Sequence, residues 1–279
     1  ADASDYGATM VPPFDHPETV AGQGTIAVEI LEQLDTTPDL VIVPVGGGGL
    51  LAGIATYLAE KAPDCRIVAV EPQGAASLTA AASEGRQVTL SHVDTFVDGA
   101  SVKRIGDTPW KAYSALADRI DVRTIDEGAV CTAMLDLYQT EGVIAEPAGA
   151  MSTAILEYLH IDAGSSVVCI LSGGNNDVSR YSEILERSLV HKGLKHYFLV
   201  NFPQEPGQLR RFLNEVLGPE DDVTRFEYLK RNNRDTGTAL VGIELGYAKD
   251  LGALQQRMDA SPLHCERLEP GTPAYTYLT

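Results

Sequence analysis

Four consecutive glycines, Gly46–Gly49, restrict what this chain can fold into more than any other feature. An apolar stretch that ends at Val45 precedes them, and an Ala/Leu-rich pattern with helical spacing follows from Leu50. Strand, glycine loop and helix start together predict an anion site, because glycines let the backbone approach a ligand and the first free N–H groups of the helix point at it. We expect the anion to be a phosphate. A tight turn without a ligand is the alternative, but four glycines cost backbone entropy that an ordinary turn does not need.

Length and composition limit the classes of protein that the chain can represent. Its 279 residues are enough for two domains, and 44% hydrophobic with 22% charged residues is typical of a soluble globular protein. No apolar run approaches the roughly 20 residues of a membrane span, and the net charge of −18 argues against nucleic acid as a partner. The four cysteines lack CxxC spacing, which predicts a reducing, cytoplasmic compartment and no metal site.

Charge is distributed unevenly and indicates a domain boundary. Residues 1–190 hold 10 Lys+Arg against 27 Asp+Glu, a net charge of −17, whereas residues 191–279 hold 11 against 12, a net charge of −1. The polar helical segment Val178–Lys192 lies at the change. We therefore expect two domains, residues 1–190 and residues 191–279.

Strands and helices alternate in the first part, which favours a parallel sheet covered by helices in an α/β fold. The predicted strands are Asp39–Val45, Arg66–Val70 and Ser166–Leu171. The predicted helices are Gly24–Leu34, Leu50–Lys61, Ser77–Ser83, Trp110–Ala117, Asp126–Glu141 and Ala148–Leu159. Residues 84–107 show little periodicity and are expected to form a loop.

A second glycine element, Ser172-Gly173-Gly174-Asn175, follows the last of these strands. Open α/β sheets bind ligands at the carboxyl ends of their strands, so Ser172 would present a hydroxyl at the mouth of the sheet. A serine in an ordinary turn is the alternative interpretation.

Three motifs, Val45–Leu50, Glu146–Ala150 and Leu171–Asn175, together resemble the threonine deaminases (threonine ammonia-lyases). These enzymes belong to the β-family (fold type II) of pyridoxal-phosphate enzymes. The segments Pro13–Asp15 and Ala21–Thr25 also look like that family, so the resemblance covers nearly all of residues 1–190 in matching order.

The resemblance implies pyridoxal 5'-phosphate as cofactor and roles for several residues. Ser172 would form a hydrogen bond with the pyridine nitrogen of the cofactor. Glu146 either lines the cavity or is a first-turn carboxylate favoured by the helix dipole. The cofactor phosphate would be held by Gly46, Gly47, Gly48, Gly49 and the N–H group of Leu50.

One departure from the family pattern bears on activity. The Schiff-base lysine of this family lies in a Ser-Phe/Tyr-Lys-x-Arg-Gly stretch well upstream of the glycine loop, and none of the seven lysines here has such a context. The expected asparagine motif is also missing. We therefore expect a C-terminal fragment that lacks the Schiff-base lysine and about a third of the catalytic part, and that is inactive alone.

The last part of the chain predicts a βαββαβ order, which is ferredoxin-like. Its expected strands are His196–Phe202, Val223–Lys230, Thr238–Leu245 and a terminal one near His264–Leu268, with helices Gly207–Leu217 and Lys249–Met258. This order resembles one copy of the ACT-like regulatory domain of biosynthetic threonine deaminases. In that family the turn at Pro206 and Gly207 is the place for an amino-acid effector, and free helix N–H groups there suit a carboxylate. A bare oligomerisation module is the alternative.

Two rival functions remain open at this point. A dinucleotide-binding oxidoreductase is one, since Gly47, Gly49 and Ala52 satisfy a permissive fingerprint and Glu71 ends the next strand, where an acid that binds ribose would lie. A non-catalytic amino-acid sensor is the other. The interpretation favoured here is an allosterically regulated threonine deaminase of isoleucine biosynthesis. It would be a homo-oligomer that converts L-threonine to 2-oxobutanoate and ammonia, with isoleucine as effector.

Overall fold

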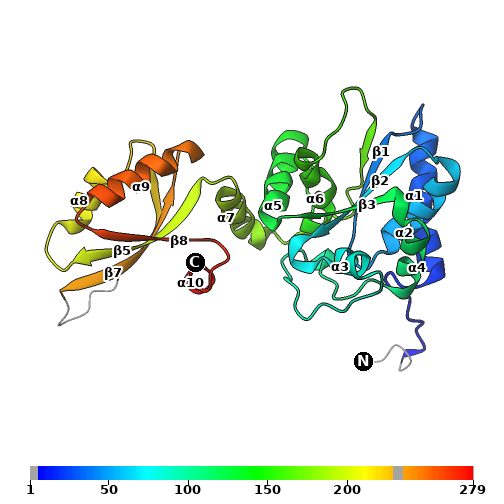
Figure 1. Ribbon diagram of the computed structural model, residues 1–279, viewed down its shortest axis with the longest axis horizontal. Helices are drawn as coiled ribbons and strands as arrows, with labels where there is room; N and C mark the ends of the chain where they lie inside the picture. The colour runs from blue at the N-terminus through cyan, green and yellow to red at the C-terminus, as the bar shows by residue number, and fades with distance from the viewer. Residues whose placement is uncertain (1–5, 229–234, 279) are drawn as a thin grey trace. The chain divides into compact units, whose positions relative to one another are not determined.

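The chain forms two compact units, Ala1–Ile184 and Leu185–Thr279, in a computed structural model that describes residues 6–228 and 235–278 (Figure 1). The division falls inside helix α7, Tyr181–His191, which begins shortly after the first unit's last strand. Within the described residues no helix is both long and apolar enough to cross a membrane.

The first unit is built on a four-stranded parallel sheet with the order β3-β2-β1-β4. Its strands are β1 (Leu40–Pro44), β2 (Arg66–Pro72), β3 (Ile120–Ile125) and β4 (Val167–Cys169). Helices cover both faces, so a central strand can be apolar throughout, and all five residues of β1 are buried. The predicted α/β class with a parallel sheet is confirmed.

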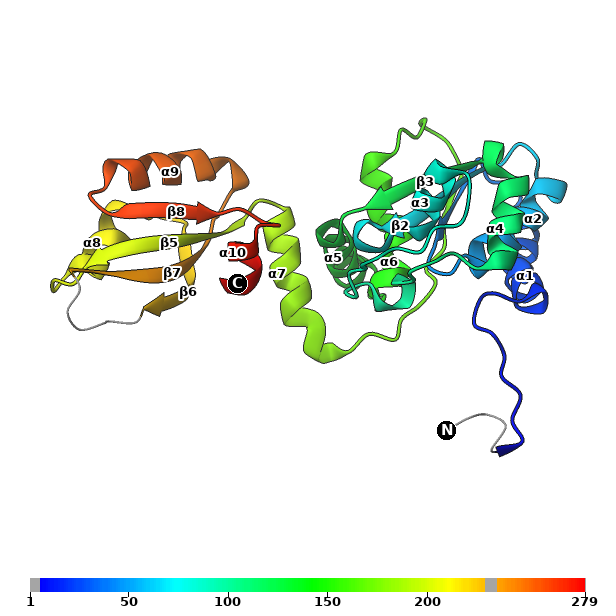
Figure 2. The same ribbon diagram turned by 60° about the horizontal axis from the view of Figure 1, so that its bottom comes forward.

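Alternate residues of β1 face two separate cores, as the pleat of a strand requires. Val41 and Val43 pack in one core with residues of α1, α2 and α3, whereas Leu40 and Ile42 pack in the other with α5 and α6. Figure 2 shows α1 and α2 apart from α5 and α6, with the strands between them. The six helices are α1 (Pro17–Gln33), α2 (Gly49–Lys61), α3 (Ser77–Glu84), α4 (Asp107–Ala115), α5 (Glu127–Asp136) and α6 (Pro147–Ala154).

Several boundaries differ from the sequence-based expectation, each for a local reason. Helix α1 begins at Pro17, because the His16 side chain accepts a hydrogen bond from the Glu18 N–H and proline suits a first helical position. The helix expected over residues 126–141 is α at first and ends in a π-turn over residues 137–141. The helix expected over residues 148–159 becomes a 3₁₀ turn after Ala154.

The second unit is an antiparallel sheet with the order β6-β7-β5-β8, which is the ferredoxin-like arrangement. The elements are β5 (Lys195–Pro203), α8 (Gln208–Glu215), β6 (Asp222–Tyr228), β7 (Thr236–Glu244), α9 (Leu251–Ala260), β8 (His264–Leu268) and α10 (Pro273–Leu278). The predicted βαββαβ order is confirmed, although α10 was not predicted. The last two residues of the strand expected at 223–230 lie outside the described residues. One face of this sheet packs on α8 and α9 around Phe198, Phe212 and Leu254.

Candidate active site

The glycine loop lies where the sequence predicts it, between the carboxyl end of β1 and the start of α2. Gly48 is the N-cap residue of α2 and has φ +89°, a left-handed conformation that glycine adopts without steric cost. No side chain caps this helix end. The first N–H groups of α2 are therefore available to a ligand, as in other anion sites at helix starts.

The loop is walled so closely that side chains would not fit in it. A methyl group at Gly46 would lie 2.9 Å from the Ala100 Cα atom, and one at Gly47 would overlap the Phe14 ring. A methyl group at Gly48 would overlap Ile105. The result is a close-fitting cradle of backbone atoms, which fits a phosphate bound through N–H groups.

Phe14 reaches the loop because the neighbouring Asp15 anchors its segment. An Asp15 Oδ1 atom accepts a hydrogen bond of 2.8 Å from the Thr108 N–H, at the start of α4. This backbone hydrogen bond lowers the pKa of the Asp15 carboxyl, so the anchor is ionised at neutral pH. The sequence marks Phe14 and Asp15 only through the family resemblance, and nothing in their local pattern indicates a contact with the glycines.

Ser172 lies beyond β4 at the same end of the sheet. The Ile170 N–H donates to the Ile42 carbonyl, so the pairing of β4 with β1 continues almost to the serine. Ser172 is exposed, and its hydroxyl forms no hydrogen bond with any described residue. The structure thus places a hydroxyl without a described partner just beyond the strand next to the one that carries the glycine loop.

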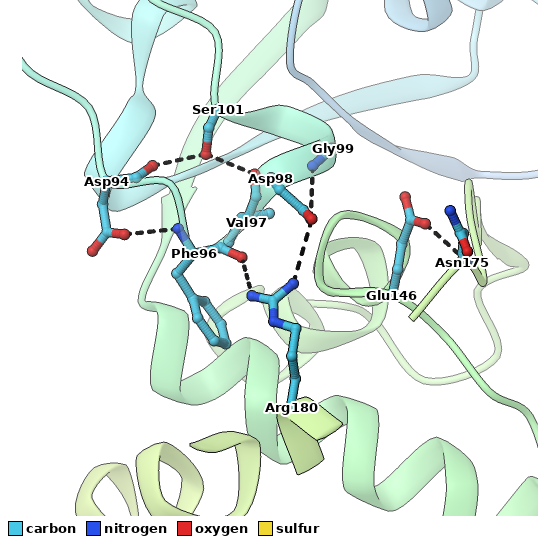
Figure 3. Close-up of polar contacts among 9 residues, drawn as sticks. All are labelled: Asp94, Phe96, Val97, Asp98, Gly99, Ser101, Glu146, Asn175 and Arg180. Carbon is cyan, nitrogen blue, oxygen red and sulfur yellow. Dashed lines mark hydrogen bonds and ion pairs between the residues drawn. The ribbon is translucent and has the colours of Figure 1, made fainter. Parts of the chain in front are cut away.

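Glu146 joins the second glycine element to a loop on the other side of the site (Figure 3). Its Oε2 atom accepts a hydrogen bond of 3.0 Å from the Asn175 N–H. A methyl group at Gly99 would lie 2.9 Å from its Oε1 atom, and one at Gly173 would overlap the carboxylate. Glu146 is the N-cap residue of α6, but its side chain makes no capping hydrogen bond to that helix.

The dinucleotide interpretation, which used Gly47, Gly49, Ala52 and Glu71, is wrong for this fold. The Glu71 side chain is fully buried and accepts hydrogen bonds from the Leu78 N–H at 2.6 Å and from the Thr79 N–H at 2.7 Å. Burial raises its pKa, and the carboxylate serves the first turn of α3. It is therefore not available to a ribose.

A second candidate site lies in the C-terminal unit, at the turn that contains Pro206 and Gly207. Gly207 has φ +92° and is the N-cap residue of α8, which has no side-chain cap. It borders a cavity of about 260 Å³. The other residues that line this cavity are Phe202, Pro203, Gln204, Glu205, Gln208, Leu209, Phe226 and Tyr228.

Comparison with protein families divides the chain in the same way as its fold. The family described as "Pyridoxal-phosphate dependent enzyme" matches residues 1–173, and the family described as "C-terminal regulatory domain of Threonine dehydratase" matches residues 186–278.

Similar curated proteins are named "L-threonine dehydratase biosynthetic IlvA". That of Mycobacterium tuberculosis is 65% identical over 277 residues, which are 99% of this chain and 65% of the relative. That of Corynebacterium glutamicum is 60% identical over 281 residues, which are 100% of this chain and 64% of the relative. The chain thus spans a little less than two thirds of the length of these relatives.

Solved structures agree with these relatives. The processed form of threonine deaminase isoform 2 from Solanum lycopersicum superposes with a TM-score of 0.60 at 37% identity, over 67% of this chain and 54% of that chain. The crystal structure of the T.th. threonine deaminase has a TM-score of 0.58 at 32% identity, over 63% of this chain and 65% of that chain. Because the first family covers more than half of the chain, and its glycine loop and sheet have the expected geometry, the chain belongs to the family of pyridoxal-phosphate dependent enzymes.

Proposed function

We propose that the protein is a threonine deaminase that converts L-threonine to 2-oxobutanoate and ammonia in isoleucine biosynthesis. The observation that carries this proposal is the pairing of two elements at one sheet edge: the backbone cradle Gly46–Gly49 on β1 and the free hydroxyl of Ser172 beyond β4. They match the two ends of pyridoxal phosphate, a phosphate and a pyridine nitrogen. The names of the most similar relatives support threonine as the substrate.

The residues of the chain have separate tasks in this proposal. The N–H groups of Gly46, Gly47, Gly48, Gly49 and Leu50 bind the phosphate. Ser172 donates a hydrogen bond to the ring nitrogen but, being a neutral hydroxyl, does not protonate it. Pyridoxal phosphate, when bound, supplies an electron sink next to the α-carbon of the substrate. A hydroxyl partner leaves that sink milder than a carboxylate would, which suits loss of the β-hydroxyl group.

Glu146 completes the wall of the proposed site. Its carboxylate holds the Asn175 N–H and packs on Gly99 and Gly173, so it fixes the second glycine element against the loop opposite. This contact orients the backbone that leads from Ser172.

We propose that the C-terminal domain binds a branched-chain amino acid as an inhibitor, and that this amino acid is isoleucine. The free N–H groups of α8 suit its carboxylate. Glu205, at the rim of the cavity, suits its ammonium group, and the rings of Phe202 and Phe226 suit an aliphatic side chain. An oligomerisation module would share the fold but not the paired polar groups at the mouth. We further propose that the enzyme is a cytoplasmic homo-oligomer.

A turnover assay tests the catalytic proposal. We expect the intact enzyme to form 2-oxobutanoate from L-threonine at roughly 1–1000 per second, and to accept L-serine, which lacks one methyl group. The 279-residue chain alone should form no 2-oxobutanoate, even with added cofactor, because none of its lysines stands in the family's lysine motif. Turnover by the 279 residues would contradict the expected absence of the Schiff-base lysine, and an intact enzyme inactive on both substrates would contradict the proposed reaction.

A further inference from the structure

Arg180 forms a clamp on a loop of the first unit that lies behind the cofactor cradle. One guanidinium nitrogen donates to the Phe96 carbonyl at 2.7 Å, and another lies 3.4 Å from an Asp98 carboxylate oxygen. The guanidinium also lies over the Phe96 ring, 5.0 Å from its centre. Figure 3 shows all three groups converging on Arg180, which ends the short 3₁₀ turn Val178–Arg180 just before α7.

An apolar contact one helical turn later anchors the same segment. Ile184 of α7 is fully buried and belongs to the same core cluster as Phe96, Val97 and Ala100. Arg180 therefore holds residues 94–101 by polar contacts, and Ile184 at the start of α7 packs in the same core as this segment.

Hydrogen bonds within residues 94–101 make this segment an internally braced unit. The Ser101 hydroxyl lies 2.7 Å from both the Asp94 and the Val97 carbonyl oxygens, and the Phe96 N–H donates to an Asp94 carboxylate oxygen at 2.8 Å. The second carboxylate oxygen of Asp98 accepts from the Gly99 N–H at 3.0 Å. Arg180 is thus connected to Gly99 through a single side chain.

The opposite side of this braced unit touches the cradle without any free space. A methyl group at Gly46 would lie 2.9 Å from Ala100 Cα and 3.3 Å from the Gly99 carbonyl oxygen. Close-packed groups transmit small displacements, because there is no void to absorb them. A shift of Arg180 therefore reaches the backbone proposed to bind the phosphate.

The far half of α7 has its own anchor, inside the second unit. Glu186 accepts hydrogen bonds of 2.5 Å from the Lys195 ammonium and from the Tyr197 hydroxyl, both on β5. Helix α7 is continuous from Tyr181 to His191. Helix α7 thus follows directly on Arg180, buries Ile184 in the core of the first unit and joins Glu186 to β5 within the second unit.

We propose that Arg180 is a positioning residue that fixes the cofactor cradle through residues 94–101, and that effector binding reaches the cradle by displacing this clamp. The regulatory half of this inference, in which the effector displaces the clamp, rests on the proposed function. Its positioning half rests only on the contacts within the first unit. Such coupling requires a structural element with two arrangements, and ligands at both sites must shift the balance between them.

The positioning half is tested by cofactor binding to the intact enzyme. We expect Arg180→Ala to raise the dissociation constant of pyridoxal phosphate about tenfold, a change of about 1.4 kcal/mol in binding free energy, measured by titrating apoenzyme and following cofactor absorbance. The dissociation constant of Arg180→Lys should lie between those of the wild type and Arg180→Ala, because lysine cannot bind the carbonyl and the carboxylate in the planar geometry of arginine. Arg123→Ala, which breaks a comparable Arg–Asp pair on β3, is the matched control and should change nothing.

A double-mutant cycle distinguishes the clamp from general destabilisation. Asp98→Asn should also weaken cofactor binding, and the double variant with Arg180→Ala should be no weaker than the worse single variant. Additive effects, or an Arg180→Ala enzyme that binds the cofactor within twofold of the wild type, would overturn the positioning role. If Arg180→Ala does not fold, Arg180→Lys and Asp98→Asn decide the same question.

The regulatory half is tested with isoleucine. Calorimetry should show that Arg180→Ala binds isoleucine at least as tightly as the wild type, because no clamp has to be displaced, while isoleucine no longer changes the threonine concentration at half-maximal rate. A variant that keeps the wild-type response overturns this half. A wild-type enzyme that does not respond to isoleucine overturns the proposed effector, and the regulatory half with it, whereas the cofactor titration still decides the role of Arg180.

Discussion

Removing the hydroxyl oxygen of Ser172 is expected to lower the turnover rate without loss of the cofactor from its site. In the intact enzyme, Ser172→Ala would leave the ring nitrogen of the cofactor without a neutral partner, and an unsatisfied buried acceptor costs about 1–3 kcal/mol. We expect the turnover number to fall roughly 10- to 100-fold, while the absorbance spectrum shows that the cofactor is still bound. Ser172→Thr keeps the hydroxyl and serves as the control. Unchanged kinetics in Ser172→Ala would make the serine a turn residue only.

Glu71 gives the fold a dependence on pH with a defined sign. Burial raises its pKa above the ordinary value of 4.5, so the folded protein binds this proton more tightly than the unfolded chain. The stabilisation from protonation is fully present below the ordinary pKa and is lost as the pH rises through the folded pKa. Glu71→Gln cannot ionise. Urea unfolding of both proteins between about pH 5 and about pH 8 should therefore show the wild type losing stability relative to the variant. Parallel pH profiles would contradict this assignment.

At the residue scale, local chemistry was predictable from the sequence and spatial neighbours were not. Gly46–Gly49 and Ser172 follow apolar strands, and position in a parallel sheet implies which edge they occupy. Phe14 and Arg180 stand far from the glycines in sequence and reach the site through tertiary packing alone. No local pattern encodes such a contact.

Helices α1 and α2 approach each other through glycine, which gives a sharp test at the scale of elements. A methyl group at Gly53 would overlap the Val20 carbonyl and lie 2.6 Å from the Gly24 nitrogen. We expect Gly53→Ala to lower the free energy of unfolding by about 1–3 kcal/mol, as overpacking does. Gly22 is a helical glycine with nothing within 4 Å of its added methyl. Gly22→Ala should instead stabilise by about 0.5–1 kcal/mol. Equal urea midpoints for the two variants would contradict the close crossing.

The positions of strands and helices were predictable from the sequence where one face or the whole element is buried, and less so at the edge of the sheet. Strand β3 was missed because Asp121 and Arg123 stand among its apolar residues, and among the described strands it pairs only with β2, at the edge of the sheet. The early start of α1 was missed because Gly22 and Gly24 lower helix propensity in its first turns. Packing against α2 and the proline at position 17 outweigh that cost.

At the scale of the whole molecule, effector binding should be measurable on the 279-residue chain. We expect isoleucine to release or absorb heat in calorimetric titration, and Glu205→Gln to weaken its binding by up to about fivefold, the effect of an exposed charge pair worth about 0.2–1 kcal/mol. Glu220→Gln, away from the cavity in the same unit, is the control. No heat at millimolar isoleucine, with the chain folded and in its native oligomer, would leave assembly as the role of this domain.

The backbone cradle and the acidity of the domain around it also shape how fast the cofactor arrives. The dipoles of the glycine loop hold an anion only at short range, whereas residues 1–190 carry 27 acidic against 10 basic side chains. Their repulsion extends over roughly a Debye length, about 10 Å at 0.1 M salt. We therefore expect these acidic residues to slow the approach of an anionic ligand that the loop then retains, and added salt to quicken its capture by screening the repulsion.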